Sequence, residues 1–138
     1  MTTPRGLRNH NPGNLRHSSD RWRGMARDQT DNDFVAFEHP VYGIRALART
    51  LLTYQEKYGL RTLRQMVERW APPVENDTQA YIAHLAALTG VAPDAPIALR
   101  DRPQEFGLMV LGIIRHENGA VPYEKALIDD GILLACAA

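Results

Sequence analysis

An apolar segment that ends in an acid is the strongest constraint on how this chain of 138 residues folds. The run "FGLMVLGII" covers residues 106–114, and "RHENG" follows at 115–119. Residues at helical spacing form one broad face, namely Met109, Val110, Ile113, Ile114 and Glu117. Because such a face must be buried, the segment predicts a core helix whose last turn continues the stripe with a carboxylate.

Similar periodicity predicts that most of the remaining chain is helical. The expected helices cover about 40–58, 62–70, 76–89, 103–117 and 124–137. In the first of them, apolar residues fall on one face: Ile44, Leu47, Ala48, Leu51 and Leu52. The 62–70 helix has a similar stripe that Trp70 continues, which favours a core role for this tryptophan.

Start and stop signals set the ends of these helices. Pro40 suits a first turn, and Thr62 suits an N-cap. Asn76 is the expected N-cap of the next helix, where Gln79 completes a capping box, and Gly90 marks its end.

The N-terminal residues 1–37 are rich in Gly, Asn, Asp and Arg, which predicts loops and one short hairpin. The strand candidates are "WRGMA" at 22–26 and "DFVAF" at 33–37. The expected fold is therefore mainly α (α+β), a single domain over residues 1–138 with a small β element at its N-terminus.

The charge balance argues against a chain that binds nucleic acid or membranes through its overall charge, because the formal net charge is +0. The distribution is uneven: residues 1–27 contain six Arg and one acid, Asp20, so 6 − 1 = +5. This basic arm suits either an anionic partner or a solvated loop.

Cofactors, metals and targeting segments are not expected. Cys136 is the one cysteine, and the five histidines show no HExxH spacing. The start, "MTTPRGLRNHNPGN", has no apolar core, so it does not resemble a signal peptide, and no run approaches a membrane span. We expect synthesis in a host cytoplasm without a signal peptide.

Glu117 has a structural and a chemical interpretation. In the first it is a surface residue, paired with Arg115 or His116, at a helix end where the dipole mildly disfavours it. In the second, its apolar border partly desolvates it and favours its protonated form. A protonated carboxyl group is what glycosidic cleavage needs at the leaving oxygen.

The segment "LGIIRHENG" resembles the end of the catalytic helix in the lysozyme-like superfamily. Lytic transglycosylases and glucosaminidases of that superfamily have Glu-Ser there, and their Glu is the general acid/base. The resemblance implies this role for Glu117, with Asn118 in place of the Ser.

A second block resembles the same superfamily in a different order. "NPGNLR" at 11–16, "WRG" at 22–24 and "DFVAF" at 33–37 are similar to a glucosaminidase run that follows the catalytic Glu. Here it precedes Glu117. Since 21 residues follow Glu117 and ten precede Asn11, joining the ends would separate them by 21 + 10 = 31 residues. The resemblance therefore implies a circularly permuted lysozyme-like domain.

The overall pattern, including "RWAPPVENDTQAY" at 69–81, also resembles small phage proteins with a predicted lysozyme-like domain. It implies a phage or prophage glycosidase, a lytic transglycosylase or muramidase that degrades peptidoglycan in the periplasm or cell wall. The alternative is a non-catalytic virion or wall-binding protein with other virion proteins as partners. A nucleic-acid binder is a third, disfavoured possibility.

Several residues are candidates for contacting a glycan. Asn11, Gly13 and Asn14 suit a sharp loop that offers amides to a sugar, with Gly13 free to adopt positive φ. A simple Pro-Gly turn is the alternative. Trp22 suits either stacking on a sugar or closing the core beneath the hairpin.

Three further candidates are Tyr81, whose role is implied by the resemblance, and Glu75 and Tyr123, which are also expected to contact the substrate. Tyr81 is expected to support catalysis, with Tyr123 as its alternative, and Glu75 is a second acid that also suits a helix N-terminus. A hydrolase normally needs a second carboxylate, for which the chain offers Asp28, Asp31, Asp33, Glu38 and Glu75. A transglycosylase needs one acid/base, since its substrate assists, and this favours a transglycosylase.

Overall fold

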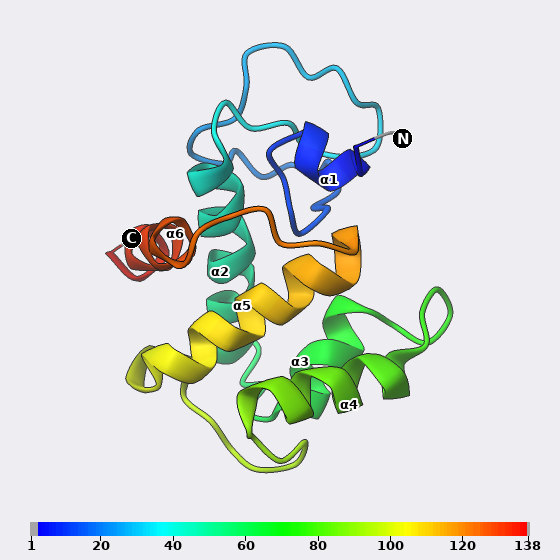
Figure 1. Ribbon diagram of the computed structural model, residues 1–138, viewed down its shortest axis with the longest axis vertical. Helices are drawn as coiled ribbons and strands as arrows, with labels where there is room; N and C mark the ends of the chain where they lie inside the picture. The colour runs from blue at the N-terminus through cyan, green and yellow to red at the C-terminus, as the bar shows by residue number, and fades with distance from the viewer. Residues whose placement is uncertain (1–2, 138) are drawn as a thin grey trace. The chain divides into compact units, whose positions relative to one another are not determined.

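The computed structural model describes residues 3–137, and helices dominate this part of the chain (Figure 1). In order, they are α1 (Arg5–Arg8), α2 (Pro40–Glu56), α3 (Leu63–Trp70), α4 (Thr78–Thr89), the 3-10 turn η1 (Leu99–Asp101), α5 (Pro103–Asn118) and α6 (Lys125–Ala137). The prediction of a mainly α fold is confirmed. The short helix α1 and the turn η1 were not predicted.

The predicted apolar stripes form the core. The five residues of the α2 stripe are at most 1% exposed, as are Met109, Val110, Ile113 and Ile114 of α5. In α3, Leu63, Met66 and Val67 are buried, and Trp70 is partly buried. Periodicity therefore identified the buried faces of these helices.

Two helix ends test the capping predictions. Thr62 caps α3, and its side chain and that of Gln65 form a reciprocal capping box. The prediction for α4 was wrong by one residue: Asp77, not Asn76, is the N-cap, and its carboxylate accepts the Ala80 amide at 3.1 Å. Both residue types cap well, so local preference does not separate them.

The predicted N-terminal hairpin is not formed. Segment 33–37 divides its bonds between two partners, with isolated bridges from Phe34 to Arg16 and from Phe37 to Met25. The Ala36 amide hydrogen bonds to the Gln29 side chain at 2.8 Å. Each pairing is thus too short to make a strand.

The chain divides into two compact units. The first contains residues 1–49 and 113–138, so it unites both ends of the sequence, and the second contains residues 50–112. Within the first unit α6 packs closely on α2, because a Cβ on Gly131 would lie 2.5 Å from the Ile44 side chain. Within the second, α3 packs against α4.

Candidate functional site

The first unit brings Glu117 to the N-terminal loop. Glu117 lies in the last turn of α5 and is partly exposed. The Asn14 side-chain amide donates to its Oε1 at 3.3 Å. Two residues that the sequence proposed separately, as acid and as glycan contact, therefore lie side by side.

Asn11 holds the loop in shape. It is 0% exposed, and its amide group donates to the carbonyls of Leu15 and Val35 at 3.0 and 2.8 Å. Its Oδ1 accepts the Leu15 amide at 3.0 Å. Because its side chain is buried and hydrogen bonds to the backbone, Asn11 stabilises the loop and has no exposed surface with which to contact a sugar.

Asn14 adopts a left-handed conformation with φ 52°, as does the nearby His10 with φ 51°. Gly13 is buried and is not among the residues with positive φ, so the prediction for Gly13 was wrong. Glycine tolerates this conformation best, but asparagine adopts it more readily than most other residues. Here the Asn14 amide donates to the Asn11 carbonyl and the Leu15 amide donates to Asn11 Oδ1, and these two bonds hold Asn14 in the left-handed conformation.

Asn118 fastens the end of α5 to the same loop. This residue is buried, and its amide donates to the Pro12 carbonyl at 2.8 Å and to the Ile114 carbonyl at 2.9 Å. Sequence reasoning treated Asn118 only as a substitute for a serine. The Asn-Gly pair gives a turn signal, which does not reveal such a contact.

Gly6 makes this packing possible. A Cβ at Gly6 would lie 2.6 Å from Asn118 Oδ1, 2.7 Å from Asn14 Oδ1 and 2.9 Å from the Asn11 carbonyl oxygen. Both side-chain oxygens are buried without a hydrogen-bond partner. They therefore face the Cα of Gly6, where a weak C–H···O contact is the available compensation. Gly6 was not predicted as a site residue.

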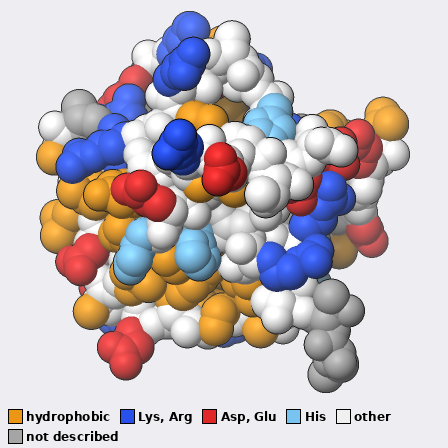
Figure 2. Space-filling view, turned by 90° about the horizontal axis from the view of Figure 1, so that it is seen from above, with side chains coloured by type: hydrophobic (Ala, Val, Ile, Leu, Met, Phe, Trp, Pro, Cys, Tyr) orange, Lys and Arg blue, Asp and Glu red, His pale blue; other side chains and the backbone are white. Residues whose placement is uncertain are grey.

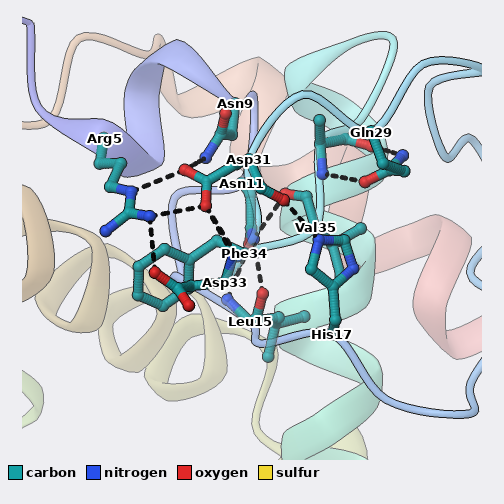
Figure 3. Close-up of polar contacts among 11 residues, drawn as sticks. Arg5, Asn9, Asn11, Leu15, His17, Gln29, Asp31, Asp33, Phe34 and Val35 are labelled. Atoms are coloured by element: carbon teal, nitrogen blue, oxygen red, sulfur yellow. Dashed lines mark hydrogen bonds and ion pairs between the residues drawn. The ribbon is translucent and has the colours of Figure 1, made fainter.

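Asp31 is the centre of a polar network beside this loop (Figure 3). Its carboxylate accepts from Arg5 at 2.6 and 2.7 Å, from Asn9 at 3.1 Å, and from the amides of Asp33 and Phe34. The hydrogen-bonded Arg5 guanidinium holds the pKa of Asp31 far below its usual range. A carboxylate held in this way cannot readily take up a proton, so Asp31 is a poor candidate for a second catalytic acid.

Aromatic residues of the loop also have structural partners. The guanidinium groups of Arg5 and Arg16 both contact the Phe34 ring, at 4.7 and 4.9 Å from its centre. Trp22 is partly buried and packs against a small core that includes Val35 and Phe37. This contact matches the expectation that Trp22 closes the core, and its exposed part leaves stacking on a sugar open.

Tyr123 also belongs to the first unit. Its hydroxyl group is buried without a hydrogen-bond partner, and burial raises its pKa. The remaining candidates, Tyr81 and Glu75, belong to the second unit. Tyr81 is fully buried and its hydroxyl oxygen accepts from Trp70 Nε1 at 3.1 Å, whereas Glu75 is exposed.

No group of three or more His, Cys, Asp or Glu side chains is placed to hold a metal ion within residues 3–137. In the same residues, every helix is too short or too polar to cross a bilayer.

A curated relative of the chain is a bacteriophage protein. No protein-family model matches it. Over 130 residues it is 40% identical to Protein P5 of Pseudoalteromonas phage PM2, an alignment that covers 92% of this chain and 79% of that protein. At this identity and coverage, the chain belongs to the same family as Protein P5 of Pseudoalteromonas phage PM2.

Proposed function

We propose that this protein cleaves the glycan strand of peptidoglycan, with Glu117 as general acid and then base. The hydrogen bond from Asn14 to Glu117 is the observation that carries the proposal. It fixes a partly exposed carboxyl group at the end of a buried helical stripe, beside a loop that could contact a sugar. An acid catalyst must be both accessible and held within reach of the leaving oxygen.

Contacts between the N-terminal loop and the end of α5 support our proposal of the lysozyme-like, permuted order that the sequence resemblance implies. Residues 11–16 and Glu117 lie far apart in the sequence but belong to one compact unit, and Asn14 and Asn118 link them. In the proposed ancestral order these segments would follow one another through the joined termini.

The acids of the first unit favour a lytic transglycosylase over a hydrolase. Asp31 and Asp33 both accept hydrogen bonds from Arg5, so these two carboxylates are already paired with a cation. A hydrolase would need a second carboxylate across the scissile bond, whereas a transglycosylase uses groups of its substrate. Asp28 and Glu38, which are exposed, remain the candidates for a hydrolytic partner.

Digestion of purified peptidoglycan tests the proposal. The protein and its Glu117→Gln variant are incubated with sacculi, and the soluble products are identified by mass spectrometry. We expect glycan fragments that end in 1,6-anhydro sugars from the unaltered protein only. Reducing ends would identify a lysozyme-type hydrolase, and products that are equal for both proteins would refute the role of Glu117.

The alternative is a non-catalytic virion or wall-binding protein, which its relationship to a phage protein also suits. Sacculi that retain the protein but release no fragments would support this alternative. In either case we propose that it acts at the host cell wall, on peptidoglycan or beside other virion proteins.

A further inference from the structure

Two arginines lie on one face of α2, and a third, from the N-terminal segment, lies over a tyrosine of the same helix. Tyr42, Arg45 and Arg49 are spaced three and four residues apart, so they share one face of the helix. The Arg23 guanidinium lies over the Tyr42 ring, 5.9 Å from its centre. All four residues belong to the first unit.

Arg45 lacks a partner for a buried group. Its Nε is buried and makes no hydrogen bond, and it forms no ion pair with any described residue. Burial, together with the charges of Arg23 and Arg49, lowers the pKa of Arg45. Placing a cation in such surroundings is unfavourable unless an anion joins it.

Four of the other arginines in the described residues are neutralised by carboxylates. A salt bridge with a carboxylate is formed by each of Arg5, Arg64, Arg100 and Arg102, although these side chains are all substantially exposed to solvent. On α2, Arg49 instead donates to a neutral group, the Ala135 carbonyl, at 3.1 Å. Arg45 and Arg49 thus lie one turn apart on α2, and no carboxylate forms a salt bridge with either among the described residues.

Aromatic surface lies beside these arginines. Trp22 and Tyr42 are partly buried and pack against the small core of Val35, Phe37 and Ala46. A guanidinium group next to an aromatic ring suits a ligand that has both a carboxylate and an apolar or sugar face.

We propose that Arg23, Arg45 and Arg49 form a binding site for carboxylate groups, and that its ligand is the peptide part of peptidoglycan. The identity of the ligand rests on the proposed function, whereas the site rests on the unpartnered guanidinium. A guanidinium fork matches a carboxylate in two parallel hydrogen bonds. The stem peptides that branch from the glycan strand carry such groups, so the site would position the strand relative to Glu117.

Nucleic acid is the competing anionic ligand, and the charge distribution disfavours it. A phosphate backbone is bound by long tracts of cations. On the face shown in Figure 2, Lys and Arg side chains form separate groups among acidic and hydrophobic ones. The formal net charge of the whole chain is +0.

Binding measurements in the Glu117→Gln background test the site without requiring catalysis. The probes are a disaccharide-peptide fragment with free carboxylates, the same fragment with its carboxylates amidated, and glycan strands freed of peptide. We expect Arg45→Gln to weaken binding of the acidic fragment about 10- to 100-fold, as for loss of a charge-assisted contact. Binding of peptide-free glycan should not change. Arg27→Gln, which removes an exposed arginine of the same unit, should change neither.

Thermal melts verify that the variants fold, and Arg45→Lys provides a second test. Arg45→Gln should melt at the same or a higher temperature, since it removes a partly buried cation that forms no salt bridge with the described residues. Arg45→Lys keeps the charge but loses the fork, so it should also bind the acidic fragment less tightly than the unaltered residue. Equal affinity for acidic and amidated fragments, or tighter Arg45-dependent binding of a single-stranded oligonucleotide, would overturn the proposal. If binding depends on Arg45 but the protein with Glu117 unaltered releases no glycan from sacculi, this site would be upheld and the proposed cleavage refuted.

Discussion

The side-chain amide of Asn14 donates a hydrogen bond to Glu117 Oε1 at 3.3 Å, although the two residues are 103 positions apart in the sequence. The bond joins the N-terminal loop to the end of α5 within one compact unit. It orients the proposed catalytic carboxyl group. The two residues can be substituted separately to test this role.

Glu117→Gln should abolish cell-wall lysis while leaving the fold intact. Gln keeps the shape and can still accept from Asn14, but it has no proton to transfer. General acid/base catalysis contributes roughly 10²- to 10⁴-fold, so a turbidity assay on cells stripped of their outer membrane should detect the loss. The melting temperature should stay the same or rise slightly, because a neutral side chain suits the end of a helix dipole better. Lysis at the unaltered rate would require another acid, with Glu75 and Glu38 tested first.

Two substitutions of Asn14 separate its backbone role from its side-chain role. Gly accepts the left-handed φ of 52° but lacks the amide, whereas Ala lacks the amide and is strained there. Both variants should lose activity, and only Asn14→Ala should also lose about 1 kcal/mol of unfolding free energy. Chemical denaturation beside the lysis assay measures both effects. If Asn14→Gly lysed cells normally, the amide would have no part in catalysis.

Gly6→Ala should disturb the site from beneath. Its Cβ would meet the side-chain oxygens of Asn118 and Asn14 at 2.6 and 2.7 Å, and the Asn11 carbonyl oxygen prevents a simple shift. We expect a loss of about 1–3 kcal/mol in unfolding free energy, as for other overpacked positions, and reduced activity of the folded fraction. Gly59→Ala is the control, since Gly59 also resists substitution, with φ +66°, but has open space around it. That variant should be less stable and fully active when folded.

Sequence periodicity predicted the helices well because each apolar stripe is a local signal. The stripes of α2, α3 and α5 are all buried as expected. Helix ends were predicted less accurately, since the N-cap of α4 was expected at Asn76 and is Asp77. The prediction of a hairpin was wrong for a different reason. Segment 33–37 has the sequence pattern of a strand, but its backbone pairs with Arg16, with Met25 and with the Gln29 side chain instead of with one neighbouring strand.

The candidate site was predicted only in part, because its geometry depends on contacts between distant residues. The resemblance to lysozyme-like enzymes singled out Glu117 and Asn14, which do meet. It gave no reason to expect that Asn11 would be buried or that Asn118 would bond to Pro12. An unpaired Arg45 is equally invisible in sequence, since pairing is known only once the neighbours are placed.

Tyr81→Phe tests whether this tyrosine takes part in catalysis or only in packing. Its hydroxyl oxygen accepts from Trp70 Nε1 at 3.1 Å, and the side chain is fully buried. Trp70→Phe removes the same hydrogen bond from the other side and is the matched control. If the role is structural, as burial suggests, each variant should lose stability, with about 0.5–1.5 kcal/mol due to the hydrogen bond. Both should lyse cells at the normal rate below their melting temperatures. Loss of lysis in Tyr81→Phe alone would support the catalytic role that the resemblance implies.

Asp31→Asn should change how the stability of the protein depends on pH. The hydrogen-bonded Arg5 guanidinium holds the pKa of Asp31 far below its value in the unfolded chain, which is about 3.9. A depressed pKa contributes stability that is fully present above the unfolded value and is lost as the pH falls towards the folded value. The melting temperature of the unaltered protein should therefore decrease as the pH is lowered below about 4. The melting temperature of Asp31→Asn should be lower than this at pH 7, but it should depend less on pH in acid. Asp129→Asn breaks an exposed pair with Lys125 and should have little effect at any pH. Parallel acid dependence of the melting temperature in the unaltered protein and Asp31→Asn would show that the Arg5–Asp31 pair does not stabilise the loop.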